Sequence, residues 1–557
     1  MSRHAFSVLF SLGSLSLAAA TPLFPRQNNV TNTTTVQTFA EVPVSANLTW
    51  TPCFDDFTCA NLEVPLDYAD LSAGTTVVAF IKKDARTQPA KDILFNPGGP
   101  GGSGISFMIA ASSQLNQILG SQYNLVSFDP RGVNNSGPNL DCFEGKPALR
   151  DFYDTQTFQS VDANSTTSLS EQFSKADGFG KWCTRTLNDT AGYANTPAVA
   201  TDMLHFAELR KEAEGKPADE AKLYYYGVSY GTILGSTFAS LYPDRVGRLI
   251  LDGVADAEDY YAGLWKSNLH QTDDAINSFF EFCYNAGSDC IFHQSASSPA
   301  DIERRFNAVL ESLSETPLSV SDPEIVDYPV IVTAGDVRGW ILWAMYGAIE
   351  RFPILARIMA ELEVGNATTY ITLSQEGKAP ESECNFDAPL YSSNQPKLLI
   401  SCNDANGRYN MSTVEAWKKH VDELVDLSFY IGEVWAPSNS VNCRSLEVKP
   451  PKSQVFNGFK NGTKTSFPIL FVENKFDPVT PSAKKMSSFF PGSVVLTQNA
   501  VGHGLSAAES NCIIGYVQQY LGNGTLPKEN TVCEVKDVPF LASEERRAFL
   551  AKRSVKL

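Results

Sequence analysis

The sequence has little of what nucleic-acid-binding, redox and membrane-spanning proteins need. Lysine and arginine number 44 against 62 aspartates and glutamates, which gives a formal net charge of −18. Such a surface repels nucleic acid, and no basic stripe argues otherwise. None of the cysteines forms a C-x-x-C pair of the kind that binds zinc or does redox chemistry. No apolar run is long enough to cross a bilayer. We therefore expect no nucleic acid, membrane, metal or cofactor as a partner.

The N-terminus has the pattern of a secretion signal. Arg3 and His4 precede an apolar run over residues 5–17, and three alanines follow at 18–20. This predicts a signal peptide over residues 1–20 and a secreted, extracellular protein. Residues 21–45 are rich in Thr, Asn, Pro and Gln, which is typical of a flexible leader.

Two further patterns agree with secretion. Ten N-x-S/T sites predict glycosylation; their asparagines are Asn29, Asn32, Asn47, Asn134, Asn164, Asn188, Asn366, Asn410, Asn461 and Asn523. The 11 cysteines are expected to be mostly paired in an oxidising compartment. The candidate pairs are Cys53 with Cys59, Cys142 with Cys183, Cys283 with Cys290, Cys402 with Cys443, and Cys512 with Cys533. Cys384 is the candidate for the unpaired thiol.

Apolar strands and amphipathic helices alternate over residues 46–254 and again over 461–540. This alternation predicts an α/β fold with a doubly wound, mostly parallel sheet. Residues 255–460 read as a mainly helical insert, which we expect to form a lid. Its five tryptophans are expected to build its own core rather than to contact substrate. Residues 541–557 read as a tail. The oligomeric state is not encoded in these patterns.

The stretch around Ser229 predicts a nucleophile. An apolar strand over 223–226 runs into Gly227-Val228-Ser229-Tyr230-Gly231, and a helix follows. A G-x-S-x-G turn between strand and helix holds a serine hydroxyl at the tip of a sharp bend, and glycines on either side avoid a clash. The pattern also arises by chance in long chains, so a catalytic role for Ser229 also needs a base and an acid elsewhere in the sequence.

A glycine-rich loop lies upstream, at residues 96–104, directly after a short strand. The alternatives are a plain surface loop or a phosphate cradle, but a cradle needs a lysine that is missing here. The position favours an oxyanion hole, built from the backbone N–H groups of Tyr230 and of Gly99 or Gly98.

A serine nucleophile needs a histidine base, and the base needs an acid. Of the six histidines, His503 alone stands in a glycine-flanked loop directly after a predicted strand. Asp477 stands likewise after the preceding strand. The order Ser229, Asp477, His503 is the Ser…Asp…His order of α/β-hydrolases, although a lone Gly-His-Gly or Asp-Pro is usually a turn. Asp252, after another strand, is the rival acid.

Several motifs together resemble a known family. NPGGPGGSG at 96–104, FDPRGVNNSG at 128–137, YYGVSYGT at 225–232, FDPVTP at 476–481 and GHG at 502–504 are similar to secreted α/β-hydrolases of the tripeptidyl aminopeptidase type, within the prolyl-aminopeptidase-like serine peptidases. The segment from Cys512 to Cys533 resembles the C-terminal region of that family. The resemblance implies Ser229 as nucleophile, Asp477 as acid, His503 as base and a helical lid. Pro97-Gly98-Gly99 replaces the His-Gly-Gly of prolyl aminopeptidases.

The expected activity is acyl transfer to water, most simply by an exopeptidase that releases N-terminal residues or short peptides. Such an enzyme must bind a free ammonium, so acidic lid residues near the site are expected. The alternatives are a secreted carboxylesterase or a tailoring hydrolase of secondary metabolites acting on small esters or amides, and a non-catalytic α/β-hydrolase used as a binding module.

Overall fold

The computed structural model describes residues 35–541 except 327, 376–390, 410 and 439. Several expectations lie outside the described residues: the signal peptide 1–20, the sequons at Asn29, Asn32 and Asn410, the candidate thiol Cys384, and the tail beyond 541.

The centre of the fold is an 11-stranded sheet in the order β1-β3-β4-β6-β5-β7-β8-β11-β12-β13, with β2 paired to β3. From β6 to β13 all neighbours are parallel, whereas β2, β3, β4 and β6 pair antiparallel. The strands are β1 Val44–Ser45, β2 Thr51–Cys53, β3 Phe57–Pro65, β4 Thr75–Lys83, β5 Asp92–Asn96, β6 Asn124–Phe128, β7 Leu223–Val228, β8 Val246–Asp252, β11 Leu470–Phe476, β12 Val494–Val501 and β13 Val532–Cys533. The prediction of a mostly parallel sheet is confirmed.

Helices cover both faces of this sheet. Helices α1 (Gly104–Leu119) and α16 (Asn511–Asn523) pack together on one face, over a core that includes Met108, Leu125 and Val517. Helices α4 (Thr196–Ala213) and α5 (Tyr230–Leu241) cover the other face. That second core contains Phe206 and Phe238 and continues into the helical layer, so sheet and helical layer share one apolar interior.

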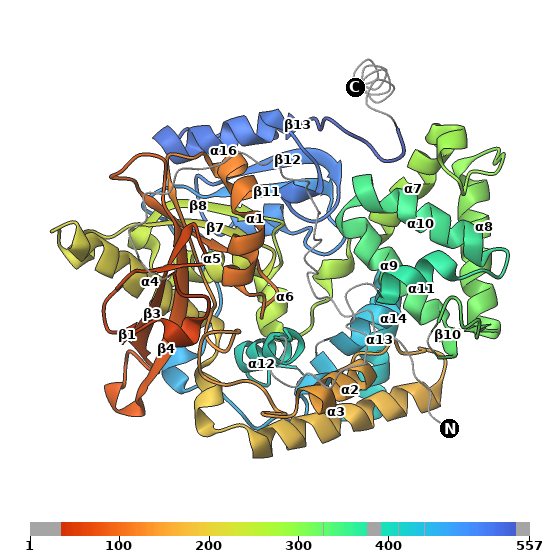
Figure 1. Cartoon of the computed structure of the whole chain (residues 1–557), viewed down its shortest axis with the longest axis horizontal. Helices are drawn as coiled ribbons and strands as arrows, with labels where there is room; N and C mark the ends of the chain where they lie inside the picture. The colour runs from red at the N-terminus through yellow and green to blue at the C-terminus, as the bar shows by residue number, and fades with distance from the viewer. Residues whose placement is uncertain (1–34, 327, 376–390, 410, 439, 542–557) are drawn as a thin grey trace.

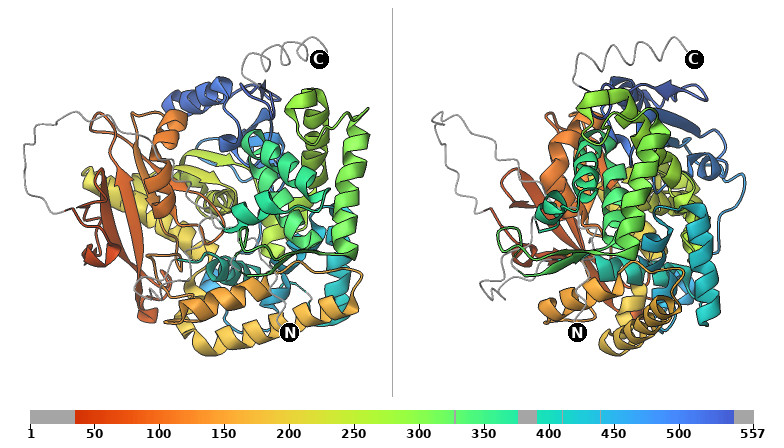
Figure 2. Two further views of the ribbon diagram at one scale, coloured as in Figure 1. Left: turned by 45° about the vertical axis from the view of Figure 1, so that its right-hand side comes forward. Right: turned by 90° about the vertical axis from the view of Figure 1, so that its right-hand side faces the viewer.

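The helical layer lies beside the sheet, on the right and along the bottom of Figure 1, and Figure 2 shows it from two other sides. Its elements are α6 Ala257–Ala262, α7 Thr272–Ala286, α8 Pro299–Glu315, α9 Ala334–Tyr346, α10 Ala348–Leu362, α11 Thr368–Gln375, α12 Asn394–Ala405, α13 Val414–Leu427, α14 Gly432–Trp435 and a short hairpin of β9 Leu318–Val320 and β10 Val330–Val332. Helices α2 (Pro147–Thr157) and α3 (Thr166–Thr186) also belong to it, because α3 packs on α13. The layer is therefore drawn from two segments of the chain rather than one.

Regular structure begins before residue 46, which corrects the expectation of a flexible leader for its described part, residues 35–45. Residues 39–41 form a short helical turn, and β1 pairs with β3. Phe39 and Val42 are buried, and the Asn61 side chain donates to the carbonyls of both. Apolar side chains within a polar stretch thus fasten the end of the leader to the edge of the sheet.

Disulfides and sequons agree with an oxidising environment. The five bonds are Cys53–Cys59, Cys142–Cys183, Cys283–Cys290, Cys402–Cys443 and Cys512–Cys533. These are the candidate pairs suggested by the sequence. The seven sequon asparagines in the described segments are all exposed: Asn47, Asn134, Asn164, Asn188, Asn366, Asn461 and Asn523. None of the described helices combines the length and apolar character that a bilayer span needs.

A buried ion pair braces the loop after β6. The Arg131 guanidinium is fully buried and binds both carboxylate oxygens of Asp202 on α4, at 2.7 and 2.8 Å. It also donates to the carbonyls of Pro65 and Leu66. The loop after β6, helix α4 and the end of β3 are thereby tied together.

We predict that Asp202→Asn destabilises the fold by about 3–5 kcal/mol, because it leaves the Arg131 charge buried without compensation. Asp422→Asn is the control, since the Lys418–Asp422 pair has side chains 51% and 47% exposed and should contribute less than about 1 kcal/mol. Urea unfolding followed by circular dichroism measures both. Equal midpoints for the two variants would contradict the bracing role of the buried pair.

Candidate active site

Ser229 occupies a strained turn between β7 and α5. Its backbone has φ 59° and ψ −123°, a conformation that costs a non-glycine residue about 1–3 kcal/mol. A Cβ on Gly227 would collide with the carbonyl of Gly231, and one on Gly231 would lie 2.7 Å from the Asn96 carbonyl. The Ser229 N–H donates to the carbonyl of Asp252 at 2.9 Å, which fixes the turn to β8. The two glycines of G-x-S-x-G are therefore required by close packing.

His503 and Asp477 meet at the ends of the next two strands. Asp477 follows β11, and His503 lies two residues after β12. The His503 Nδ1 atom is 3.1 Å from each Asp477 carboxylate oxygen. Both side chains are withdrawn from water, with 9% and 0% of their surfaces exposed. Parallel strands bring their carboxyl ends to one edge of the sheet, which explains why residues 26 apart come together.

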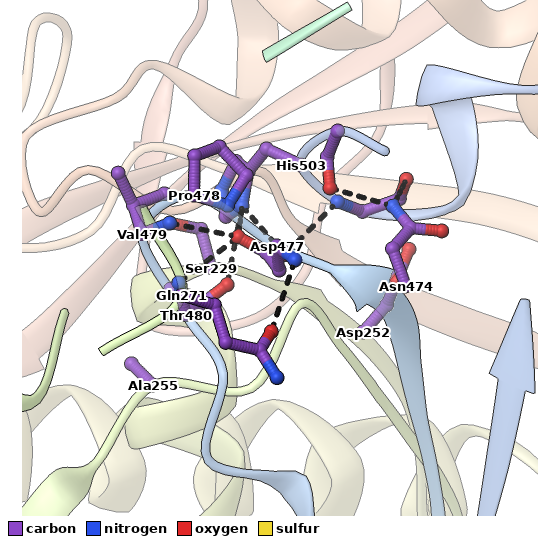
Figure 3. A network of polar contacts seen from close by, with 12 residues as sticks. Ser229, Asp252, Ala255, Gln271, Asn474, Asp477, Pro478, Val479, Thr480 and His503 are labelled. Atoms are coloured by element: carbon purple, nitrogen blue, oxygen red, sulfur yellow. Dashed lines mark hydrogen bonds and ion pairs between the residues drawn. The ribbon is translucent and has the colours of Figure 1, made fainter. Parts of the chain in front are cut away.

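Backbone and side-chain donors orient this pair (Figure 3). The Asp477 carboxylate accepts from the N–H groups of Val479 at 3.0 Å and Thr480 at 2.9 Å. The Asn474 side-chain amide donates to the carbonyls on both sides of His503, those of Gly502 and Gly504. The N–H groups of Val479 and Thr480 thus orient the Asp477 carboxylate, and Asn474 fixes the backbone on both sides of His503.

The two groups stabilise each other's charged form. Burial alone would raise the pKa of Asp477, but the His503 charge and the hydrogen bonds outweigh it and hold that pKa below its usual value. Burial alone would lower the pKa of His503, but the charges of Asp477 and Asp252 raise it above its usual value. Because an ionised Asp477 can only accept, His503 carries its proton on Nδ1 and leaves Nε2 available as a base.

Ser229 lies in the same small region. Gly253, one residue after β8, faces His503: a Cβ there would lie 3.2 Å from the imidazole Cε1 and 3.3 Å from the Asp477 carboxylate. Gly504 lies similarly against the Val228 side chain, next to Ser229. Within the described residues the Ser229 hydroxyl has no hydrogen-bond partner, and catalytic hydrogen bonds are often long before substrate binds.

The glycine-rich loop closes over the serine. A Cβ on Gly98 would lie 2.8 Å from the Ser229 Cβ and 3.0 Å from the Tyr230 nitrogen. The Gly98 N–H already donates to the Asn96 side chain at 3.0 Å. In the part of the chain that the structure describes, the Gly99 N–H has no such acceptor. Tyr230 is the first residue of α5, where a helix leaves its N–H groups unpaired. Gly99 and Tyr230 are thus the available donors, whereas Gly98 is not.

Asp252, the rival acid, has a different role. Its carboxylate accepts from the Leu505 N–H at 3.0 Å and from the Tyr226 hydroxyl at 2.7 Å. Burial raises its pKa to about 6. No hydrogen bond to His503 exists among the described residues, so Asp252 acts on the imidazole only through its charge.

Sequence reasoning missed several residues that build the site. The Gln271 side chain accepts from the Asp477 N–H at 3.2 Å, and the Thr480 hydroxyl lies 3.1 Å from His503 Nδ1. Tyr346, at the end of α9, packs edge-on against His503 and accepts the His503 N–H on its carbonyl. Only Thr480 had a signal, its place within FDPVTP; Gln271 and Tyr346 come from the helical layer, where spacing identifies no partner.

Asp404 on α12 is an acidic residue of the helical layer that lies near the serine turn. Its carboxylate accepts from the Thr196 N–H and hydroxyl and from the Tyr260 hydroxyl, and Thr196 Oγ1 lies 2.5 Å from the Tyr230 hydroxyl. Asp404 is therefore tied to the residue after Ser229, but its oxygens are occupied by the chain's own donors. Within the described residues, no three His, Cys, Asp or Glu side chains gather as a metal site requires.

Comparison with known proteins agrees with this geometry. The family model of the alpha/beta hydrolase fold matches residues 92–283, and that of the TAP-like proteins matches residues 428–533. The sheet, the serine turn and the Asp–His pair define the chain as an α/β-hydrolase of the serine hydrolase class.

Within that class, the chain is similar to tripeptidyl aminopeptidase-type proteins and has a TAP-like C-terminal region. It is 25% identical to tripeptidyl aminopeptidase of Streptomyces coelicolor, over 89% of this chain and 87% of that protein. It is also 25% identical to serine protease Hip1 of Mycobacterium tuberculosis, over 89% and 92%. Carboxylesterase B of Mycobacterium tuberculosis is 23% identical, over 85% and 86%.

We predict that Gly98→Ala lowers kcat about 10²-fold or more, because a Cβ at this position collides with the Val228 carbonyl and Ser229 and moves the loop away from the serine. Gly458→Ala is a matched control: Gly98 has φ 99° and Gly458 φ 96°, but a Cβ on Gly458 meets nothing within 4 Å. Both variants place a side chain at nearly the same positive φ, so equal kcat values would contradict a role for close packing of the loop.

The charges around His503 predict a pH dependence. The base must be neutral to act, so kcat/KM should rise with pH through a midpoint above 6.5, the ordinary pKa of histidine. Asp252→Asn removes a charge that stabilises the imidazolium, so the midpoint should move to lower pH. Asp256→Asn, four residues away, serves as the control and should leave it unchanged. An unmoved midpoint in Asp252→Asn would contradict the electrostatic account.

Proposed function

We propose that the protein is a secreted serine peptidase, acting as an exopeptidase that releases N-terminal residues or short peptides. The observation that carries the proposal is the junction of the strained Ser229 turn with the buried His503–Asp477 pair at one edge of the sheet. The relatives named tripeptidyl aminopeptidase and serine protease Hip1 support a peptide substrate.

In the proposed mechanism, Ser229, His503 and Asp477 form a triad. The Nε2 atom of His503 takes the Ser229 proton as the hydroxyl attacks the amide carbonyl. The N–H groups of Gly99 and Tyr230 stabilise the oxyanion, and the imidazolium is stabilised by Asp477. His503 then gives its proton to the leaving amine, and water hydrolyses the acyl-enzyme by the same steps in reverse order. Each oxyanion donor is worth about 10²–10³ in kcat.

Two features support an extracellular exopeptidase. Five disulfides agree with secretion into an oxidising compartment. The helical layer touches the site itself, since Tyr346 packs on His503 and Gly347 pairs with Gly502. A layer in contact with the base restricts access for long chains and favours chain ends or small molecules.

A carboxylesterase acting by the same triad is the second candidate. The relative named carboxylesterase B favours it, because that protein is similar over most of the chain. Turnover of p-nitrophenyl esters with no cleavage of peptides would replace the peptidase proposal by this one. The third possibility, a non-catalytic binding module, is disfavoured by the intact Asp–His pair.

The test compares N-terminally free and N-acetylated peptide amides of one sequence, with wild type and Ser229→Ala. We expect cleavage of the free peptide alone, and a loss of about 10⁴-fold or more in kcat for Ser229→Ala. Asp477→Asn should lose about 10⁴-fold, because it favours the wrong imidazole tautomer. Equal hydrolysis of free and blocked peptides by wild type would contradict an aminopeptidase.

A further inference from the structure

Lys397 on α12 is a cation for which the described part of the chain supplies no anion. Its ammonium lies over the rings of Trp265 and Trp435, 5.9 Å from each ring centre. Among the described residues no carboxylate or other acceptor is bound to it. Other partly buried cations of the chain do have acceptors: Lys485 binds Asp256, and Arg351 donates to the Trp343 carbonyl. A cation–π contact near 6 Å is a weak substitute for lost hydration.

The first turn of α12 rests on the glycine-rich loop. A Cβ on Gly101 would lie 2.8 Å from the backbone nitrogen of Lys397, and the Tyr391 hydroxyl donates to the Gly101 carbonyl at 2.6 Å. The same loop carries Gly98, which packs on Ser229. Lys397 is thus anchored to the loop that covers the serine.

Aromatic rings connect Trp265 to the residue after the serine. Tyr230 packs on Tyr260 at 5.7 Å between ring centres, and Tyr260 packs on Trp265 at 5.2 Å. Trp265 has φ 54°, a left-handed conformation that is strained for a tryptophan, and its carbonyl accepts from the Trp435 indole at 2.8 Å. The fold therefore holds both rings in place beside the ammonium, and α12, which carries Lys397, packs against α6 (Figure 1).

We propose that Lys397 is a specificity residue that binds a carboxylate of the substrate, so that the enzyme prefers anionic peptides or acyl groups to neutral ones. The carboxylate belongs either to the C-terminus of a short peptide or to an acidic side chain. The proposal deepens the proposed function of the same site, but it applies equally to ester substrates. It also gives a reason for keeping an unpaired ammonium in an aromatic setting.

The preference should depend on pH. Burial lowers the pKa of Lys397 to about 8, and the residue as a whole is only partly exposed. Because kcat/KM reports the free enzyme, the ratio for anionic over neutral substrate should fall as pH rises through that value. The ratio of kcat/KM for two substrates that both lack a carboxylate should show no such change.

The experiment uses three matched pairs of substrates. The first is mono-p-nitrophenyl glutarate against p-nitrophenyl butyrate. The second pair is one tetrapeptide as the free acid and as the C-terminal amide. The third pair is that C-terminal amide with either Glu or Gln at one position of the peptide. We expect wild type to prefer the anion by about 10- to 100-fold in kcat/KM in the ester pair and in at least one peptide pair. The peptide pair that responds identifies the source of the carboxylate.

Variants then assign the preference to the ammonium. Lys397→Met should abolish it, Lys397→Arg should retain it, and Lys460→Met should leave it unchanged, since Lys460 is exposed and far along the chain. The Tm of Lys397→Met should equal that of the wild type, because an apolar side chain replaces a desolvated charge. Calorimetric titration of Ser229→Ala with the peptide acid and amide repeats the comparison without turnover.

The outcomes separate the two proposals. If esters are hydrolysed and peptides are not, the peptidase function fails while the ester pair and the titration still test Lys397. No preference for the anion in wild type would overturn the proposal. The same preference in wild type and Lys397→Met would also overturn it, and a lower Tm of that variant would then assign Lys397 to the fold.

Discussion

The backbone conformation of Ser229 is the constraint on which the rest of the structure depends. A serine at φ 59° and ψ −123° is stable only where its surroundings hold it. Gly227, Gly231 and Gly98 allow the surrounding backbone to approach within a distance that no side chain would permit. The hydrogen bond from Ser229 to the Asp252 carbonyl then joins this turn to β8. Packing of strand, helix and glycine loop around one residue thus aims its hydroxyl.

Charge burial is the second requirement of the site. The His503–Asp477 pair is nearly free of solvent, and an ionised carboxylate there is tolerated only because the N–H groups of Val479 and Thr480 and the imidazole replace water. Chain segments distant in sequence supply the rest, since Gln271 holds the Asp477 backbone and Tyr346 holds that of His503. The helical layer therefore helps to position the His503 imidazole and is not only a cover.

The central sheet was predictable because each of its main strands is a short apolar run of consecutive residues. The strand predicted over residues 223–226 lies within β7. Thr333 and Asp336 form a capping box at the start of α9, a motif that a sequence can indicate locally. Strand β11 begins only at Leu470, after Pro468, which cannot donate to the ladder. The Asp–His pair could be inferred from chain order, since parallel strands end at one edge.

The remaining features depend on contacts between distant segments. Nothing local indicates that α3 packs on α13, that Gln271 reaches Asp477, or that Lys397 lies between Trp265 and Trp435. Helical periodicity identifies an apolar face but not the face that covers it. The ordered segment 35–45 was not predicted, because only two buried side chains, Phe39 and Val42, hold it against the sheet and they lie within a polar stretch.

The most direct test of the account is to label the protein with a fluorophosphonate and map the adduct by mass spectrometry. The reagent reacts with a serine only when a neighbouring base activates it. We expect a single adduct on Ser229 in the wild type, and its loss in His503→Gln while the fold is retained. An unlabelled Ser229, or labelling that is equally fast without His503, would contradict the claim that these side chains act together.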